Sequence, residues 1–170
     1  MEIKHIKPGF STVKGSELSL SGPALVHLLQ AVLGEGALAR FQAKGFSMAP
    51  FIKNKDVVTL SPLKETSPAM GDVIAFVVQG TGKLCVHRIV GKKGNLYVTK
   101  GDNSSETDES VPRESILGLV TRVERNGKEI FLGLGPERSI IALFGRTGLL
   151  LALIRPVWKG IRAIIKRSPA

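Results

Sequence analysis

The feature that most limits the fold of this chain is a series of short apolar runs, broken by turns, that begins after Ala37. No helix is expected between these runs, and an Asn126-Gly127 hairpin signal precedes the last one. Strands that follow one another without crossover helices usually pair antiparallel. We therefore predict a mainly β domain with a curled or barrel-like antiparallel sheet. The expected strands are residues 40–46, 56–60, 72–78, 84–90, 96–100, 117–124 and 129–132.

Helical patterns flank the β region on both sides. Ser21-Gly22-Pro23 provides a helix start, apolar residues follow at helical spacing, and Gly34-Glu35-Gly36 ends the run. Residues beyond Gly135 are again apolar and helical in pattern. We therefore expect a polar lead-in with an N-terminal helix at 1–36, a central domain at 37–134 and a basic amphipathic segment at 135–170.

The positive charge of the chain is concentrated near its C-terminal end. The net charge is +10, and the residues from Pro136 onward contain seven basic side chains but only one acid, Glu137. The rest of the chain is mildly basic, without an arginine-rich run and with few aromatic residues, so we predict no nucleic-acid partner.

Within this last region the basic and apolar residues separate onto two sides of a helix. Arg155, Lys159, Arg162 and Lys166 form one stripe, and Ile154, Trp158, Ile161 and Ile165 form the other. This pattern predicts a helix that lies on an anionic membrane surface. Packing onto the central domain or a partner is the alternative, and a membrane-spanning helix is left open, although two arginines and Pro156 disfavour it.

The N-terminal 22 residues lack the apolar core of a signal peptide. We expect cytoplasmic synthesis and peripheral or weakly anchored membrane association.

Three segments of the β region contain residues suited to nucleophilic catalysis. They contribute the hydroxyl of Ser47, the imidazole of His87 and the carboxylates of Asp102 and Asp108. A serine hydroxyl needs a base to take its proton, and a histidine serves near neutral pH when a carboxylate fixes its tautomer. Backbone N–H groups near Ser47 would hold the oxyanion.

These segments resemble the sequence boxes of type I signal peptidases and their LexA-like relatives. The four boxes, in family order, are G-F-S-M-A-P-F-I-K-N-K-D-V-V, G-D-V-I-A-F, V-H-R-I-V-G, and T-K-G-D-N followed by Asp108. The resemblance implies a serine endopeptidase that cleaves a protein or peptide precursor through an acyl-enzyme, without a metal or cofactor. Histidine in the base box is typical of the endoplasmic-reticulum and archaeal branch. By that resemblance Ser47 is the nucleophile, His87 the base and Asp108 the charge-relay acid, with Asp102 in support.

Other residues near these boxes have more than one interpretation. Met48 and Pro50 are expected to shape the nucleophile turn and a substrate-facing edge, with core packing as the alternative for Met48. Lys100 is an alternative base. Cys85 is the only cysteine, which excludes an intramolecular disulfide and a cysteine-based zinc cluster, and we expect it to be a small buried side chain. His27 is expected to be a partly exposed helix residue.

The chain also departs from the family pattern. Asn54-Lys55 replaces the glycine that usually precedes Asp56, and a soluble-looking helix stands where most signal peptidases have a transmembrane helix. These differences favour a specialised processing protease over general export. One alternative is a LexA-like regulator that cleaves itself or a repressor, but it should carry a DNA-binding module and a base-box lysine. The other is a non-catalytic peptide-binding or membrane-scaffolding module.

Overall fold

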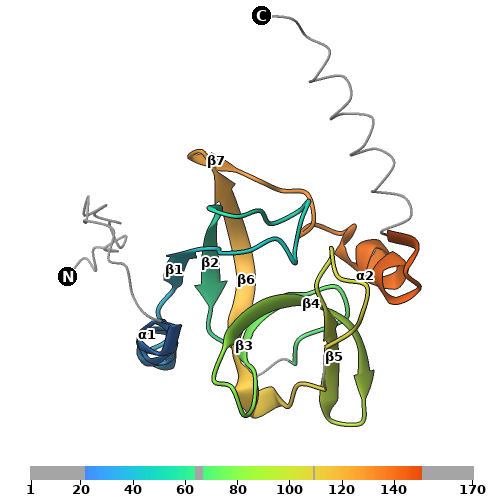
Figure 1. Cartoon of the computed structure of the whole chain (residues 1–170). Coiled ribbons are helices and arrows are strands. Elements are labelled where there is room, and N and C mark those ends of the chain that lie inside the picture. The colour runs from blue at the N-terminus through green and yellow to red at the C-terminus, as the bar shows by residue number, and fades with distance from the viewer. Residues whose placement is uncertain (1–21, 64–66, 109, 151–170) are drawn as a thin grey trace, which may run out of the picture.

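The computed structural model describes residues 22–63, 67–108 and 110–150, which form one open antiparallel sheet with two α-helices (Figure 1). The strand order is β1-β2-β6-β3-β4-β5, and β7 pairs with β6. The strands are β1 (Ala39–Gln42), β2 (Val57–Ser61), β3 (Val73–Val77), β4 (Leu84–Lys93), β5 (Leu96–Lys100), β6 (Ile116–Arg125) and β7 (Lys128–Glu129). The helices are α1 (Gly22–Gly34), α2 (Arg138–Arg146) and a short 3₁₀ helix, η1 (Arg113–Ser115). The predicted mainly β, antiparallel architecture is confirmed, with a curled sheet that does not close into a barrel.

The two faces of the sheet contact two separate apolar clusters. Along β3, Val73 and Ala75 enter one cluster, whereas Ile74 and Phe76 enter the other, as the alternation of a strand requires. Helix α1 covers the first cluster through Leu29 and Leu33, and His27 lies on its exposed side as expected.

A long turn between β1 and β2 carries the expected nucleophile. The buried Asp56 closes this turn by accepting hydrogen bonds from Arg125 at 2.9 and 2.7 Å and from the amide of Lys53 at 2.7 Å. Lys55, at the position where the family pattern has glycine, has a φ of 73°, which glycine adopts at less cost.

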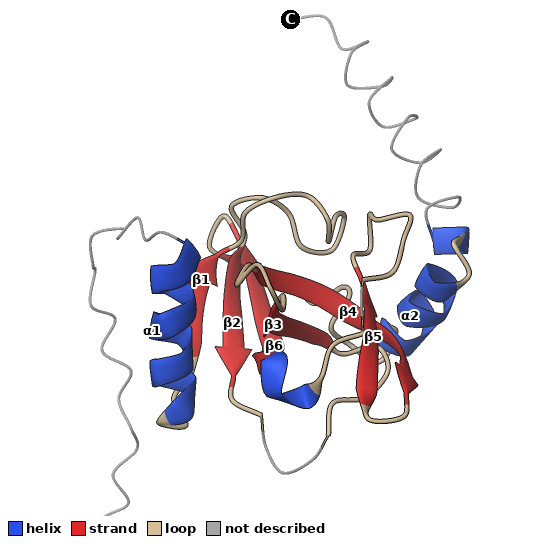
Figure 2. Ribbon diagram, turned by 60° about the horizontal axis from the view of Figure 1, so that its bottom comes forward, coloured by secondary structure: helices blue, strands red, loops and turns tan. Residues whose placement is uncertain are grey.

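Helix α2 packs on the sheet at the opposite end from α1 (Figure 2). Ile141 and Leu150 form a small cluster with Phe51, and the ammonium of the buried Lys100 donates to the Gly145 carbonyl at 2.9 Å. The predicted amphipathic stripe at 154–166 lies outside the described residues. Within the described ranges, no helix has the length and apolarity needed to cross a bilayer.

Candidate active site

Ser47 lies in a hydrogen-bonded turn that is anchored by its neighbours. The amide of Ala49 donates to the carbonyl of Phe46, and the amide of Ile52 donates to the carbonyl of Met48. Met48 and Ile52 are buried in the first cluster, while Ser47 is exposed. The side chain of Met48 is only 4% exposed and packs in the core, which is the alternative given for it above. Pro50 is half-buried in the same turn.

His87 projects from β4 and contacts two of the predicted partners. Its Nε2 lies 3.0 Å from Ser47 Oγ, and its Nδ1 lies 2.5 Å from Asp108 Oδ2. The ring is nearly buried and lies edge-to-face with Phe76, with centroids 6.1 Å apart. A carboxylate that accepts Nδ1–H leaves Nε2 free to accept the serine proton, which is the arrangement a general base needs.

Asp108 is held by the strand that precedes it. Its amide donates to the Thr99 carbonyl at 2.8 Å, and Thr99 Oγ1 donates to Asp108 Oδ2 at 2.8 Å. The Asp108 side chain is 28% exposed. Thr99 therefore fixes the oxygen that faces His87, a role that was not assigned from the sequence although Thr99 belongs to the last box.

Asp102 does not contact His87, so its expected role in orienting the imidazole is corrected. Its two oxygens accept a bidentate pair of hydrogen bonds from Arg88, each 2.8 Å long. Burial raises the pKa of the Asp102 carboxyl, and the Arg88 hydrogen bonds oppose that rise. The remaining Arg88 nitrogen donates to the carbonyls of Gly71 at 2.9 Å and Gly133 at 2.8 Å. Asp102 and Arg88 thus form a buried structural pair beside the base.

The loop that follows β5 also fixes the nucleophile turn. The amide of Asn103 donates to the Ser47 carbonyl at 2.7 Å, and its side chain donates to the Phe46 carbonyl at 3.3 Å. Gly101 lies so close that a Cβ there would be 2.7 Å from the Ser47 carbonyl oxygen. Only glycine permits this approach.

Two backbone donors are available for a developing oxyanion. In the described part of the chain, the amide N–H groups of Ser47 and Met48 have no hydrogen-bond acceptor. Unused donors beside a nucleophile are the requirement for stabilising a tetrahedral intermediate.

The other candidates lie away from the reacting atoms or serve packing. Lys100 is directed toward Gly145 and not toward Ser47. Cys85 is half-buried beside the second cluster, and burial raises the pKa of its thiol, an effect that Lys83 opposes. No group of three metal-ligating side chains occurs among the residues that the structure describes.

Comparison with protein families extends this description. A family model described as Peptidase S24-like matches residues 16–121, a range that contains Ser47, His87 and Asp108. A search of curated proteins found no match.

Proposed function

Because this chain belongs to the Peptidase S24-like family, we propose that it is a serine endopeptidase whose catalytic residues are Ser47, His87 and Asp108. The proposal rests on one observation above all: the imidazole of His87 lies between the Ser47 hydroxyl at 3.0 Å and the Asp108 carboxylate at 2.5 Å. Asp102 and Arg88 support the site from behind through their buried ion pair.

The reaction follows from this geometry. As Ser47 Oγ attacks the peptide carbonyl carbon, His87 Nε2 takes the hydroxyl proton and the N–H groups of Ser47 and Met48 receive the oxyanion. His87⁺ then gives the proton to the leaving amine, the C–N bond breaks, and an acyl-enzyme remains on Ser47. A water attacks the ester with its proton going to Nε2, and return of that proton to Oγ releases the acid.

The exposed edge of β4 suits an extended peptide. Strand β5 pairs with β4 only from Arg88 onward, so residues 84–87 have β3 as their one neighbouring strand in the described ranges. Ile89 exchanges backbone hydrogen bonds with residues 71 and 72, so its main-chain groups point toward the β3 side. Successive residues of a strand point these groups to opposite sides, so those of Val86 point toward the free edge. A substrate strand paired there would pass beside Ser47 and His87.

We propose signal-peptidase-type processing of a specific precursor, with the Ser-His chemistry of the endoplasmic-reticulum and archaeal branch. Histidine at the base position supports this subtype. Self-cleavage of the LexA-like kind is the second candidate, since the S24-like family match favours it equally.

Covalent labelling tests catalysis directly. A serine-reactive fluorophosphonate should label the wild type on Ser47, and both Ser47→Ala and His87→Ala should lose labelling and peptide cleavage while keeping the wild-type melting temperature. Ser139→Ala, an exposed serine of α2, is the matched control and should label normally. Unchanged labelling of Ser47→Ala would refute the proposal. Incubation of the pure chain, followed by intact mass, separates the candidates: fragmentation at a rate independent of protein concentration would identify self-cleavage.

The proposed location is an anionic membrane surface. The segment after Leu150, outside the described residues, combines the basic stripe of Arg155 and Lys159 with the apolar stripe of Trp158 and Ile161. Such a helix would bind through apolar burial and through attraction of each basic residue to the lipid headgroups. High salt should weaken this binding.

A further inference from the structure

Exposed apolar side chains are concentrated in one stretch of the described chain. Five of the ten large apolar residues that are exposed among the described residues lie between Phe131 and Leu149. They are Phe131, Leu132, Ile140, Leu143 and Leu149. Phe131 is the most exposed of the ten at 74%, and the adjacent Leu132 is 64% exposed. Isolated apolar residues on a surface are common, but a concentration of this kind marks an interaction site.

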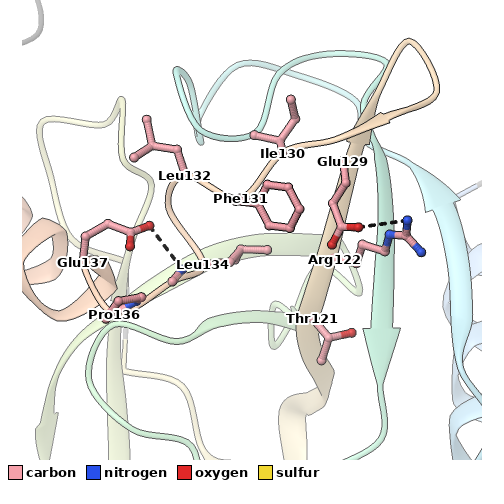
Figure 3. A pocket seen from close by; sticks show the side chains of 10 residues that line it. Thr121, Arg122, Glu129, Ile130, Phe131, Leu132, Leu134, Pro136 and Glu137 are labelled. Carbon is pink, nitrogen blue, oxygen red and sulfur yellow. Dashed lines mark hydrogen bonds and ion pairs between the residues drawn. The ribbon is translucent and has the colours of Figure 1, made fainter.

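The loop after β7 holds two of these side chains outward at the rim of a cavity. Ile130 and Leu134 pack against the first apolar cluster, so the loop is fixed at both ends while Phe131 and Leu132 remain exposed. The cavity has a volume of about 580 Å³ (Figure 3).

The acidic groups at this cavity are already satisfied within the protein. Glu129 is paired with Arg122, and the two atoms are 2.9 Å apart. Figure 3 shows this pair on one side of the cavity and Glu137 on the other. The Glu137 carboxylate accepts hydrogen bonds from the amides of Gly133 at 2.6 Å and Gly135 at 3.2 Å.

Helix α2 contributes two further exposed apolar residues. Ile140 and Leu143 are three residues apart and therefore lie on the same side of the helix, whereas Ile141, Ala142 and Gly145 are buried against the body. Arg138 at the start of the helix pairs with Asp72 at 3.3 Å, whereas Arg146 is exposed at its end. In Figure 1 the segment runs from β7 at the top of the molecule to α2 at the right.

We infer that residues 131–149 form a lipid-binding surface, in which Phe131 and Leu132 enter the interfacial region of an anionic bilayer and Arg146 contacts phosphate groups. Charge favours a bilayer over a protein partner, because the stretch that directly follows this surface, from residue 151 onward, contains five basic residues and no acid. The inference deepens the membrane association proposed above and places part of the contact on the rigid body of the protein. It does not depend on catalysis.

Vesicle partitioning of the full chain tests this surface. The wild type should sediment with vesicles of phosphatidylcholine containing phosphatidylglycerol, and more weakly with phosphatidylcholine alone. Phe131→Ser/Leu132→Ser should lower the partition coefficient at least about tenfold, because each large side chain contributes about that much when it leaves water. Leu28→Ser/Leu38→Ser, which removes two exposed leucines from the other end of the sheet, is the matched control and should stay within about twofold of the wild type.

Three results would overturn the inference. The first is that the wild type does not bind anionic vesicles, and the second is that both double variants lose vesicle binding equally. The third is that Phe131→Ser/Leu132→Ser still binds vesicles but no longer self-associates, which would identify a second copy of the chain as the occupant. Cleavage of a soluble peptide should be the same in all three proteins. A variant that loses vesicle binding but keeps cleavage therefore supports the lipid-binding surface, whatever the natural substrate is. A wild-type chain that binds vesicles but does not cleave peptides refutes only the proposed function.

Discussion

Replacing each of the two loop aspartates by asparagine should produce opposite phenotypes. Asp108 contacts the base and is 28% exposed, whereas Asp102 is buried and contacts only Arg88 among charged groups. Asp108→Asn should therefore impair catalysis with little loss of stability. Asp102→Asn should reduce stability while leaving the reacting atoms in place.

The two magnitudes follow from the contacts. Loss of the carboxylate on Nδ1 permits the wrong imidazole tautomer and costs about 10⁴ in kcat, or about 5 kcal/mol of transition-state stabilisation. Breaking a buried ion pair costs about 3–5 kcal/mol, because Arg88 keeps its charge without a counter-ion. At about 2–4 °C per kcal/mol for a chain of this size, Asp102→Asn should melt about 6–20 °C lower.

Single-turnover cleavage at 15 °C and thermal melting, run on both variants, measure these effects separately. The double variant Asp102→Leu/Arg88→Met replaces both ions by apolar side chains. It should therefore recover part of the melting temperature that Asp102→Asn loses. A loss of about 10⁴ in kcat for a folded Asp102→Asn, with near-normal activity in Asp108→Asn, would refute the assignment of the orienting acid.

Three further predictions concern single sites. Lys55→Gly should raise the free energy of unfolding by about 0.5–1 kcal/mol, because residue 55 has a φ of 73°; a chemical denaturation midpoint no higher than that of the wild type would contradict this. Gly101→Ala should lower kcat at least about 100-fold, since its Cβ would lie 2.7 Å from the Ser47 carbonyl oxygen and must displace the nucleophile; a fully active alanine variant would show that the turn yields freely. Burial raises the pKa of the Cys85 thiol, so less thiolate is present at pH 8 than in a free cysteine, and iodoacetamide should alkylate it more slowly in the native than in the urea-unfolded chain; equal rates would argue against this environment.

The sequence predicted the strands well where apolar alternation was strong and less well where an apolar run does not pair. Residues 129–132 were expected to form a strand, but β7 ends at Glu129. Ile130 and Leu134 both turn into the core, and Gly133, with a φ of 100°, lies against Phe51. That path breaks the alternation a strand requires, and it depends on a contact with a residue 82 positions away in the chain.

The candidate site was predictable in its composition and less so in its pairings. Both Asp102 and Asp108 follow β5, and it was the family resemblance that assigned Asp108 as the acid facing His87, with Asp102 expected to support it. The pairing of Arg88 with Lys100 across β4 and β5 decides against that support, because it places Asp102 next to the guanidinium. Similarly, Met48 occupies the core because its turn folds back on the sheet, which no local pattern indicates.

The acceptors of the two buried cations have a consequence for the timing of activity during synthesis. Every residue of the proposed triad precedes residue 109, yet Arg88 needs the carbonyl of Gly133 and Lys100 needs that of Gly145. A nascent chain that has left the ribosome only as far as residue 121 would hold the nucleophile, base and acid, but would bury two positive groups that lack these acceptors. Cleavage competence should therefore appear only after α2 has emerged, which delays proteolysis until nearly the whole described body has been made.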